Sequence, residues 1–172
     1  MRVCFLIAQV FAAIAVACTL PAHAGEQNIH RVLLDALICK GNPADAVYNL
    51  VRGGSNFEAG YATHGFGEGT SYKAVVILRK PLNIAGAKAF AVVSETENSN
   101  FEFNAFTYAS FEGDYLQVVQ ALKLKATEPF NNSSLGRFVS QQPPLSQCPP
   151  TVTLTPVDKK HFLLGCGWCN GG

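Results

Sequence analysis

Residues 72–79 of this chain read Tyr-Lys-Ala-Val-Val-Ile-Leu-Arg, a run rich in β-branched side chains that predicts a β-strand. Its middle, residues 75–78, is apolar on both faces of an extended chain, which indicates a central strand of a sheet. Lys80 and Pro81 follow the run. We expect the strand to end there, because proline cannot donate a hydrogen bond to a strand ladder.

Further strands are predicted on the C-terminal side of this run. Residues 87–94 and 101–110 form one pair, with the polar residues 95–100 as their connection. A C-terminal hairpin is predicted from residues 151–155 and 161–165, and a two-residue turn at Asp158-Lys159 would set its register. These segments together predict a mainly antiparallel sheet.

Three helices are predicted outside the strand region. Apolar residues with helical spacing indicate a first helix between Asn28 and Gly41, and a second between Asn42 and Gly53. A third helix is predicted to begin after Asp114. Helices and strands come in blocks rather than in alternation, which favours an α+β fold over a doubly wound one. The expected architecture is two short N-terminal helices, a mainly antiparallel sheet, a third helix and a C-terminal β-hairpin tied by disulfides.

The N-terminus has the pattern of a cleavable secretory signal. Arg2 precedes the apolar residues 3–20, Pro21 interrupts that run, and Ala22-His23-Ala24 supplies small residues for signal peptidase. We predict a signal peptide at residues 1–24 and a single α+β domain at residues 25–172, in the periplasm or secreted. Two alternatives remain, an uncleaved membrane anchor and lipidation at Cys18. We expect contact with a membrane only if Cys18 is lipidated.

The charge balance argues against a nucleic-acid partner. The chain carries 13 lysines and arginines against 12 aspartates and glutamates, and loss of Arg2 with the signal would make these numbers equal. Proteins that bind nucleic acids need a basic excess or a basic stripe to displace phosphate counterions. We therefore expect another protein as the partner.

Four cysteines follow the predicted signal, and an even number in an exported chain predicts a disulfide framework. We favour Cys148–Cys169 as a cross-strand pair of the C-terminal hairpin, which leaves Cys39–Cys166 as the second disulfide. A redox motif at Cys166-Gly-Trp-Cys169 is disfavoured because too few residues follow it for a helix. A metal site is not expected, because Cys39 and Cys148 are solitary rather than closely paired.

The most unusual stretch is residues 60–72, which contains glycines at positions 60, 65, 67 and 69. It can be interpreted as a hairpin tip or bulged strand in which glycine allows positive φ. It can also be interpreted as a protruding recognition loop. On the second interpretation, the candidate binding residues are Tyr61, His64, Phe66 and Glu68.

No catalytic motif stands out in the chain. It contains no His-Glu-x-x-His, no Gly-x-Ser-x-Gly and no phosphate loop, so we predict no cofactor and assign no catalytic residue. The leading hypothesis is an exported, non-enzymatic protein-binding module, such as an inhibitor or an immunity factor against an envelope-acting toxin. One alternative is a small extracytoplasmic hydrolase with His64 or His161 as base beside Glu68 or an aspartate. Another is a lipid-anchored structural protein of the envelope.

Overall fold

The computed structural model describes residues 21–68, 71–98, 103–127, 136–141 and 148–170. These residues form the following elements: α1 (Pro21–Leu37), α2 (Pro43–Gly53), β1 (Tyr61–Glu68), β2 (Ser71–Ile84), β3 (Ala87–Asn98), β4 (Phe103–Glu112), α3 (Tyr115–Ala121), β5 (Lys125–Ala126), β6 (Phe138–Val139), β7 (Cys148–Pro156) and β8 (His161–Asn170). Most of the predicted signal peptide, including Cys18, lies outside the described residues, so signal cleavage and lipidation stay predictions.

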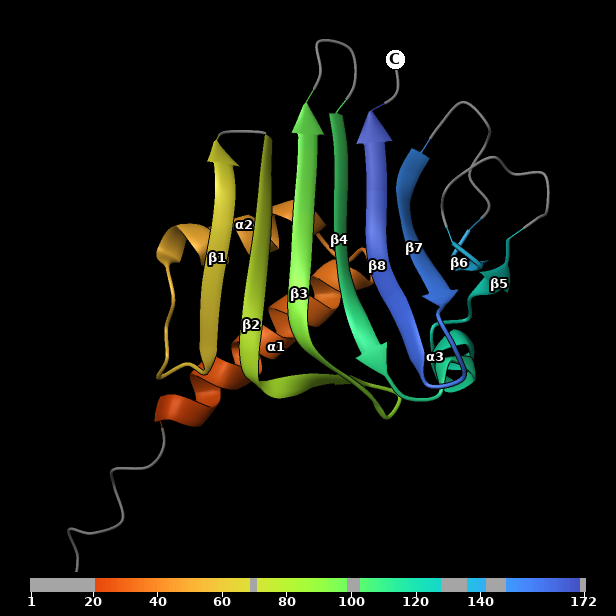
Figure 1. Cartoon of the computed structure of the whole chain (residues 1–172), viewed down its shortest axis with the longest axis horizontal. Helices are drawn as coiled ribbons and strands as arrows, with labels where there is room; N and C mark the ends of the chain where they lie inside the picture. Colours follow the sequence, from red (N-terminus) through yellow and green to blue (C-terminus); the bar gives the residue numbers. More distant parts are fainter. Residues whose placement is uncertain (1–20, 69–70, 99–102, 128–135, 142–147, 171–172) are drawn as a thin grey trace, which may run out of the picture.

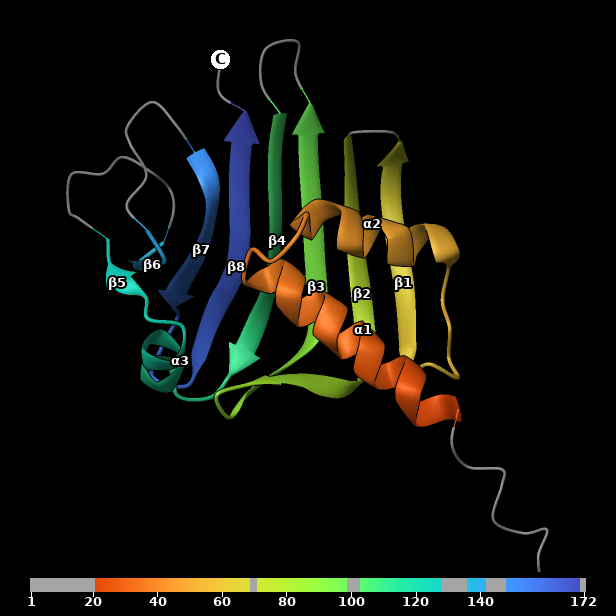
Figure 2. The ribbon, with the colours of Figure 1, turned by 180° about the vertical axis from the view of Figure 1, so that it is seen from behind.

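One sheet unites all the strands of the described chain. Its order is β1-β2-β3-β4-β8-β7-β6-β5, and every neighbouring pair is antiparallel. The helices α1 and α2 lie on one face of this sheet, and α3 lies at one end near β7 and β8 (Figures 1 and 2). This arrangement confirms the predicted α+β fold, with its N-terminal helices, mainly antiparallel sheet, third helix and C-terminal hairpin.

The main core lies between the sheet and the two N-terminal helices. Leu33 and Leu37 of α1 and Val47 of α2 are completely buried in it. From β2, alternate side chains point into this core: Tyr72, Ala74, Val76 and Leu78. Such burial of one strand face and one helix stripe is the dominant source of stability in a domain of this kind.

Both N-terminal helices begin with favourable local chemistry. In α2 the side chain of Asn42 accepts a hydrogen bond from the backbone N–H of Asp45, and Pro43 occupies the first turn. The helix α1 begins at Pro21, earlier than the predicted start at Asn28. The extension is physically reasonable because proline fits the first turn of a helix and Ala22 and Ala24 favour helix.

The predicted end of β2 at Lys80 and Pro81 is wrong. The strand continues to Ile84, and its pairing with β3 is irregular between Ile77 and Leu82. Pro81 lies inside this bulge, where the ladder is interrupted and the missing N–H of proline is tolerated. Beyond the bulge, Leu82 is completely buried and extends the core.

The C-terminal hairpin is present, but its register differs by one residue from the predicted one. Thr151 opposes Gly167, whereas a two-residue turn at Asp158-Lys159 would have placed it against Cys166. The observed turn is longer, because β7 ends at Pro156 and β8 begins at His161. A second irregularity between Cys148 and Thr151 then brings Cys148 opposite Cys169, as predicted.

Candidate functional site

The sheet has one face that no helix of the described chain covers, the face toward the viewer in Figure 1. We call it the open face. Because side chains alternate between the two faces of a strand, the register identifies which residues it carries. One row across β1 to β4 consists of Phe66, Lys73, Glu95 and Phe106, and the next consists of His64, Val75, Val93 and Tyr108.

Large apolar side chains on this face are exposed to solvent. Phe66 on β1 is 82% exposed, Ile77 on β2 is 51% exposed, and Phe106 on β4 is 39% exposed. Between them lie the half-buried Val75 and Val93. Several large exposed apolar side chains on one face indicate an interaction site more often than a single exposed one does.

A hollow of about 670 Å³ lies over the part of β1 to β4 that contains the first row. Phe66 and Phe106 line it from β1 and β4, so an aromatic ring stands at each side. Its polar lining includes Lys73, Glu95, Glu97 and Asn104. The hollow therefore combines two aromatic walls with a small set of charged and amide groups, which is typical of a binding site.

Two of the three charged side chains that line the hollow form an ion pair with each other. Lys73 Nζ lies 3.9 Å from Glu95 Oε2, and the Tyr108 hydroxyl donates a hydrogen bond to Glu95 Oε1 at 3.2 Å. Burial, and after it the charge of Glu95, raises the pKa of Tyr108, so the hydroxyl remains a donor at neutral pH. By contrast, Glu97 is exposed and makes no ion pair with any described residue.

The described part of the glycine-rich stretch, residues 60–72 without residues 69–70, is mostly β-strand. It forms β1, at the edge of the sheet, and the start of β2. Gly65 allows α2 to approach, because a Cβ at this position would lie 2.7 Å from Val51 Cγ1. Gly67 has φ +111°, a conformation that favours glycine, next to the connection into β2.

The structure separates the candidate binding residues of this stretch. His64 and Phe66 are exposed and share the open face. Tyr61 is partly buried and packs against the core. The backbone of Glu68 opposes Ser71 in the ladder. Sequence reasoning missed Lys73, Glu95 and Phe106 as neighbours of Phe66, although period-two alternation along residues 72–79 and 101–110 was a usable signal.

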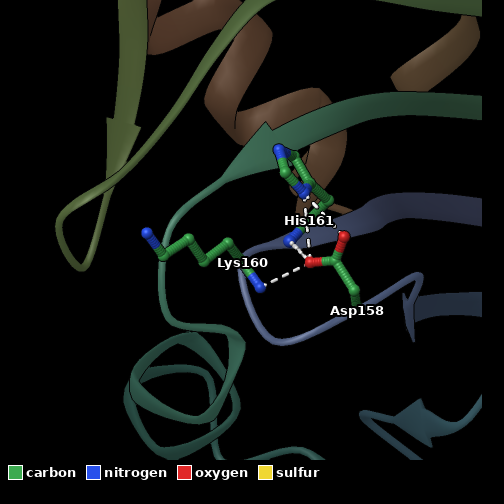
Figure 3. A network of polar contacts seen from close by, with 3 residues as sticks. All are labelled: Asp158, Lys160 and His161. Carbon is green, nitrogen blue, oxygen red and sulfur yellow. Dashed lines mark hydrogen bonds and ion pairs between the residues drawn. The ribbon is translucent and has the colours of Figure 1, made fainter.

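The two candidate histidine bases lie on different parts of the sheet. His64 is on β1, whereas His161 is at the β7–β8 turn, with its Nδ1 2.9 Å from Asp158 Oδ2. The backbone N–H groups of Lys160 and His161 also donate to Asp158 Oδ1, at 2.7 and 2.8 Å (Figure 3). These contacts, the Lys160 N–H foremost and the His161 side chain next, lower the pKa of Asp158. The carboxylate of Asp158 thus closes the turn.

The cysteines follow the predicted pairing as far as the structure describes them. The disulfide Cys39–Cys166 is present, with a Cα–Cα distance of 5.2 Å. Cys148 and Cys169 are opposite each other in the backbone ladder. The described part of the chain contains no cluster of three or more metal-ligating side chains. None of its helices has the length and hydropathy required to cross a bilayer.

No family model matches this chain. No curated protein and no solved structure matches it significantly.

Proposed function

We propose that this protein is an exported protein-binding module that holds its partner on the open face of the sheet. The observation that carries the proposal is the hollow between Phe66 and Phe106, together with the exposed Ile77 farther along the same face of the sheet. Exposed aromatic side chains around a depression are the typical anchors of protein–protein interfaces, where a few residues supply most of the binding free energy.

The composition of the open face supports a protein as the partner. Its middle is apolar, with Val75, Val93 and Ile77, and the ion pair of Lys73 and Glu95 lies beside this apolar middle. Interface centres are similarly depleted in charge and enriched in aromatic residues. A nucleic acid would require an excess of positive charge, and the formal net charge of the chain is only +1.

Export is part of the same proposal. It is supported by the signal-like residues 1–24 and by the disulfide Cys39–Cys166, since disulfides persist mainly in oxidising compartments. Within this class we favour an inhibitor or an immunity factor, because such proteins act by occupying a surface. An intact mass of the exported protein that matches a chain beginning at Gly25 would support cleavage of the signal peptide during export. A lipid adduct on Cys18 or retention of residues 1–24 would contradict it.

Site-specific photocrosslinking in the producing cell tests the binding surface. We would place p-benzoylphenylalanine at position 106 or 77 on the open face, and at position 157 as a control. Val157 is apolar and 69% exposed, but it lies in the β7–β8 turn. The expected result is one discrete protein adduct from positions 106 and 77 that position 157 does not give.

A second variant distinguishes specific binding from surface stickiness. Adding Ile77→Lys to the crosslinker at position 106 should remove the adduct, because an ammonium group would have to be desolvated in an apolar contact. Val157→Lys should leave the adduct unchanged. Equal adducts from all three crosslinker positions, or an adduct that survives Ile77→Lys, would refute binding on the open face.

A further inference from the structure

The hollow on the open face has an unbalanced charge. Its described lining residues that carry a charge at neutral pH are Lys73, Glu95 and Glu97. The ammonium of Lys73 faces Glu95, so these two charges largely cancel at a distance of 3.9 Å. The carboxylate of Glu97 is left without a cation among the described residues, next to the amide of Asn104 in the lining.

The aromatic walls favour the same kind of ligand group as the free carboxylate. A cation is attracted to the face of an aromatic ring as well as to a carboxylate. Among the cationic side-chain groups, guanidinium binds to a ring face and to a carboxylate with the smallest desolvation cost, because it is planar and weakly hydrated. It can also donate a pair of parallel hydrogen bonds to a carboxylate. The ring of Phe106, on the strand that pairs with the strand of Glu97, would contact the aliphatic part of such a side chain, which is itself apolar.

We infer that the hollow receives an arginine side chain of the partner, flanked by apolar residues that contact Phe66 and Phe106. The guanidinium pairs with Glu97, and the Asn104 amide oxygen accepts a further hydrogen bond. The inference rests on the proposed function, because it specifies the chemistry of the partner on the same open face. Charge complementarity and the aromatic lining of the hollow carry it.

Binding of a defined peptide tests this chemistry without knowledge of the partner. The probe is a capped tripeptide of leucine, arginine and leucine, titrated into ¹⁵N-labelled protein and followed by NMR shifts. The control peptide contains citrulline, which has the shape of arginine but no charge. We expect shifts concentrated at residues 95–97 and 104–106, and weaker binding of the citrulline peptide.

A matched pair of variants tests the role of Glu97. Glu97→Gln keeps the size of the side chain and removes its charge, and it should weaken binding of the arginine peptide about two- to fivefold, as for an exposed ion pair. Glu112→Gln, at the far end of β4, should leave binding unchanged. Equal binding of both peptides, shifts elsewhere on the protein, or no effect of Glu97→Gln would overturn the inference.

The crosslinking experiment separates this inference from the proposed function. If the partner adduct at position 106 survives Glu97→Gln in full, the proposal of partner binding on the open face is retained. The inference that an arginine of the partner pairs with Glu97 is then refuted. If no adduct forms but the arginine peptide binds in a charge-dependent way, the hollow recognises the cation and the proposal of a protein partner fails.

Discussion

Cys39, just beyond the C-terminal end of α1, is joined by a disulfide to Cys166 in β8, and the two residues are 127 positions apart in the chain. The bond ties the junction of α1 and α2 to the middle of the sheet. Cys166 is completely buried on the helix-covered face. The two helices are thereby held against the sheet face opposite the proposed binding surface.

The double variant Cys39→Ala/Cys166→Ala should be strongly destabilised. In the chain-entropy model, a disulfide that closes a loop of this length lowers the free energy of the folded state relative to the unfolded state by about 4–5 kcal/mol. Urea unfolding of parent and variant, with Cys148 and Cys169 intact in both, measures the difference. Coincident unfolding midpoints would show that this covalent link contributes little.

The folded domain should contain a second disulfide, Cys148–Cys169, and no free thiol among its four cysteines, Cys39, Cys148, Cys166 and Cys169. The two residues oppose each other in the β7–β8 ladder, where Cα atoms have the separation that a disulfide requires. Peptide mapping without reduction should yield a linked pair of peptides that separates on reduction. A peptide bridged between Cys166 and Cys169 would contradict both predicted pairings.

Phe66→Ala should leave stability almost unchanged, while Phe111→Ala should destabilise the protein. Phe66 is on the open face and is mostly exposed, so its truncation to alanine removes little buried apolar surface. The change in the free energy of unfolding should therefore be below about 0.5 kcal/mol. Phe111 is buried and stacks on Phe162 with ring centroids 5.5 Å apart. Its truncation should cost about 3–5 kcal/mol. Thermal unfolding of the two variants makes the comparison, and a large loss for Phe66→Ala would assign Phe66 to the core.

Asp158 should make stability depend on pH in acid. The N–H of Lys160 and the His161 side chain lower its pKa in the folded state below the unfolded value of about 3.9. A carboxyl group with a depressed folded pKa stabilises the fold above the unfolded pKa, and this contribution is lost as the pH falls through the folded pKa. Asp158→Asn keeps a carbonyl acceptor for the turn but removes the charge.

Unfolding of the parent and of Asp158→Asn should therefore be compared over a range of pH. The parent should be the more stable of the two at neutral pH, and the difference should shrink as the pH falls below about 4. A difference that is independent of pH would mean that the turn depends on the shape of Asp158 and not on its charge.

The sequence by itself determined the types and order of most elements, because these depend on neighbouring residues. Asn42 and Pro43 specify the start of α2, and the side chain of Asp114 accepts a hydrogen bond from the N–H of Leu116 at the start of α3. Capping and periodicity are local, so they can be recognised without knowledge of the rest of the chain. The α+β class followed from the order of these elements.

Only the tertiary structure decided the candidate site. An apolar run such as residues 75–78 is equally compatible with a strand covered on both faces and with one that leaves Ile77 exposed. The position of α1 and α2 on a single face makes the difference, and it depends on packing between residues far apart in the sequence. The same holds for the row of Phe66, Lys73, Glu95 and Phe106, because a shift of one residue in the register of any strand would send its side chain to the opposite face.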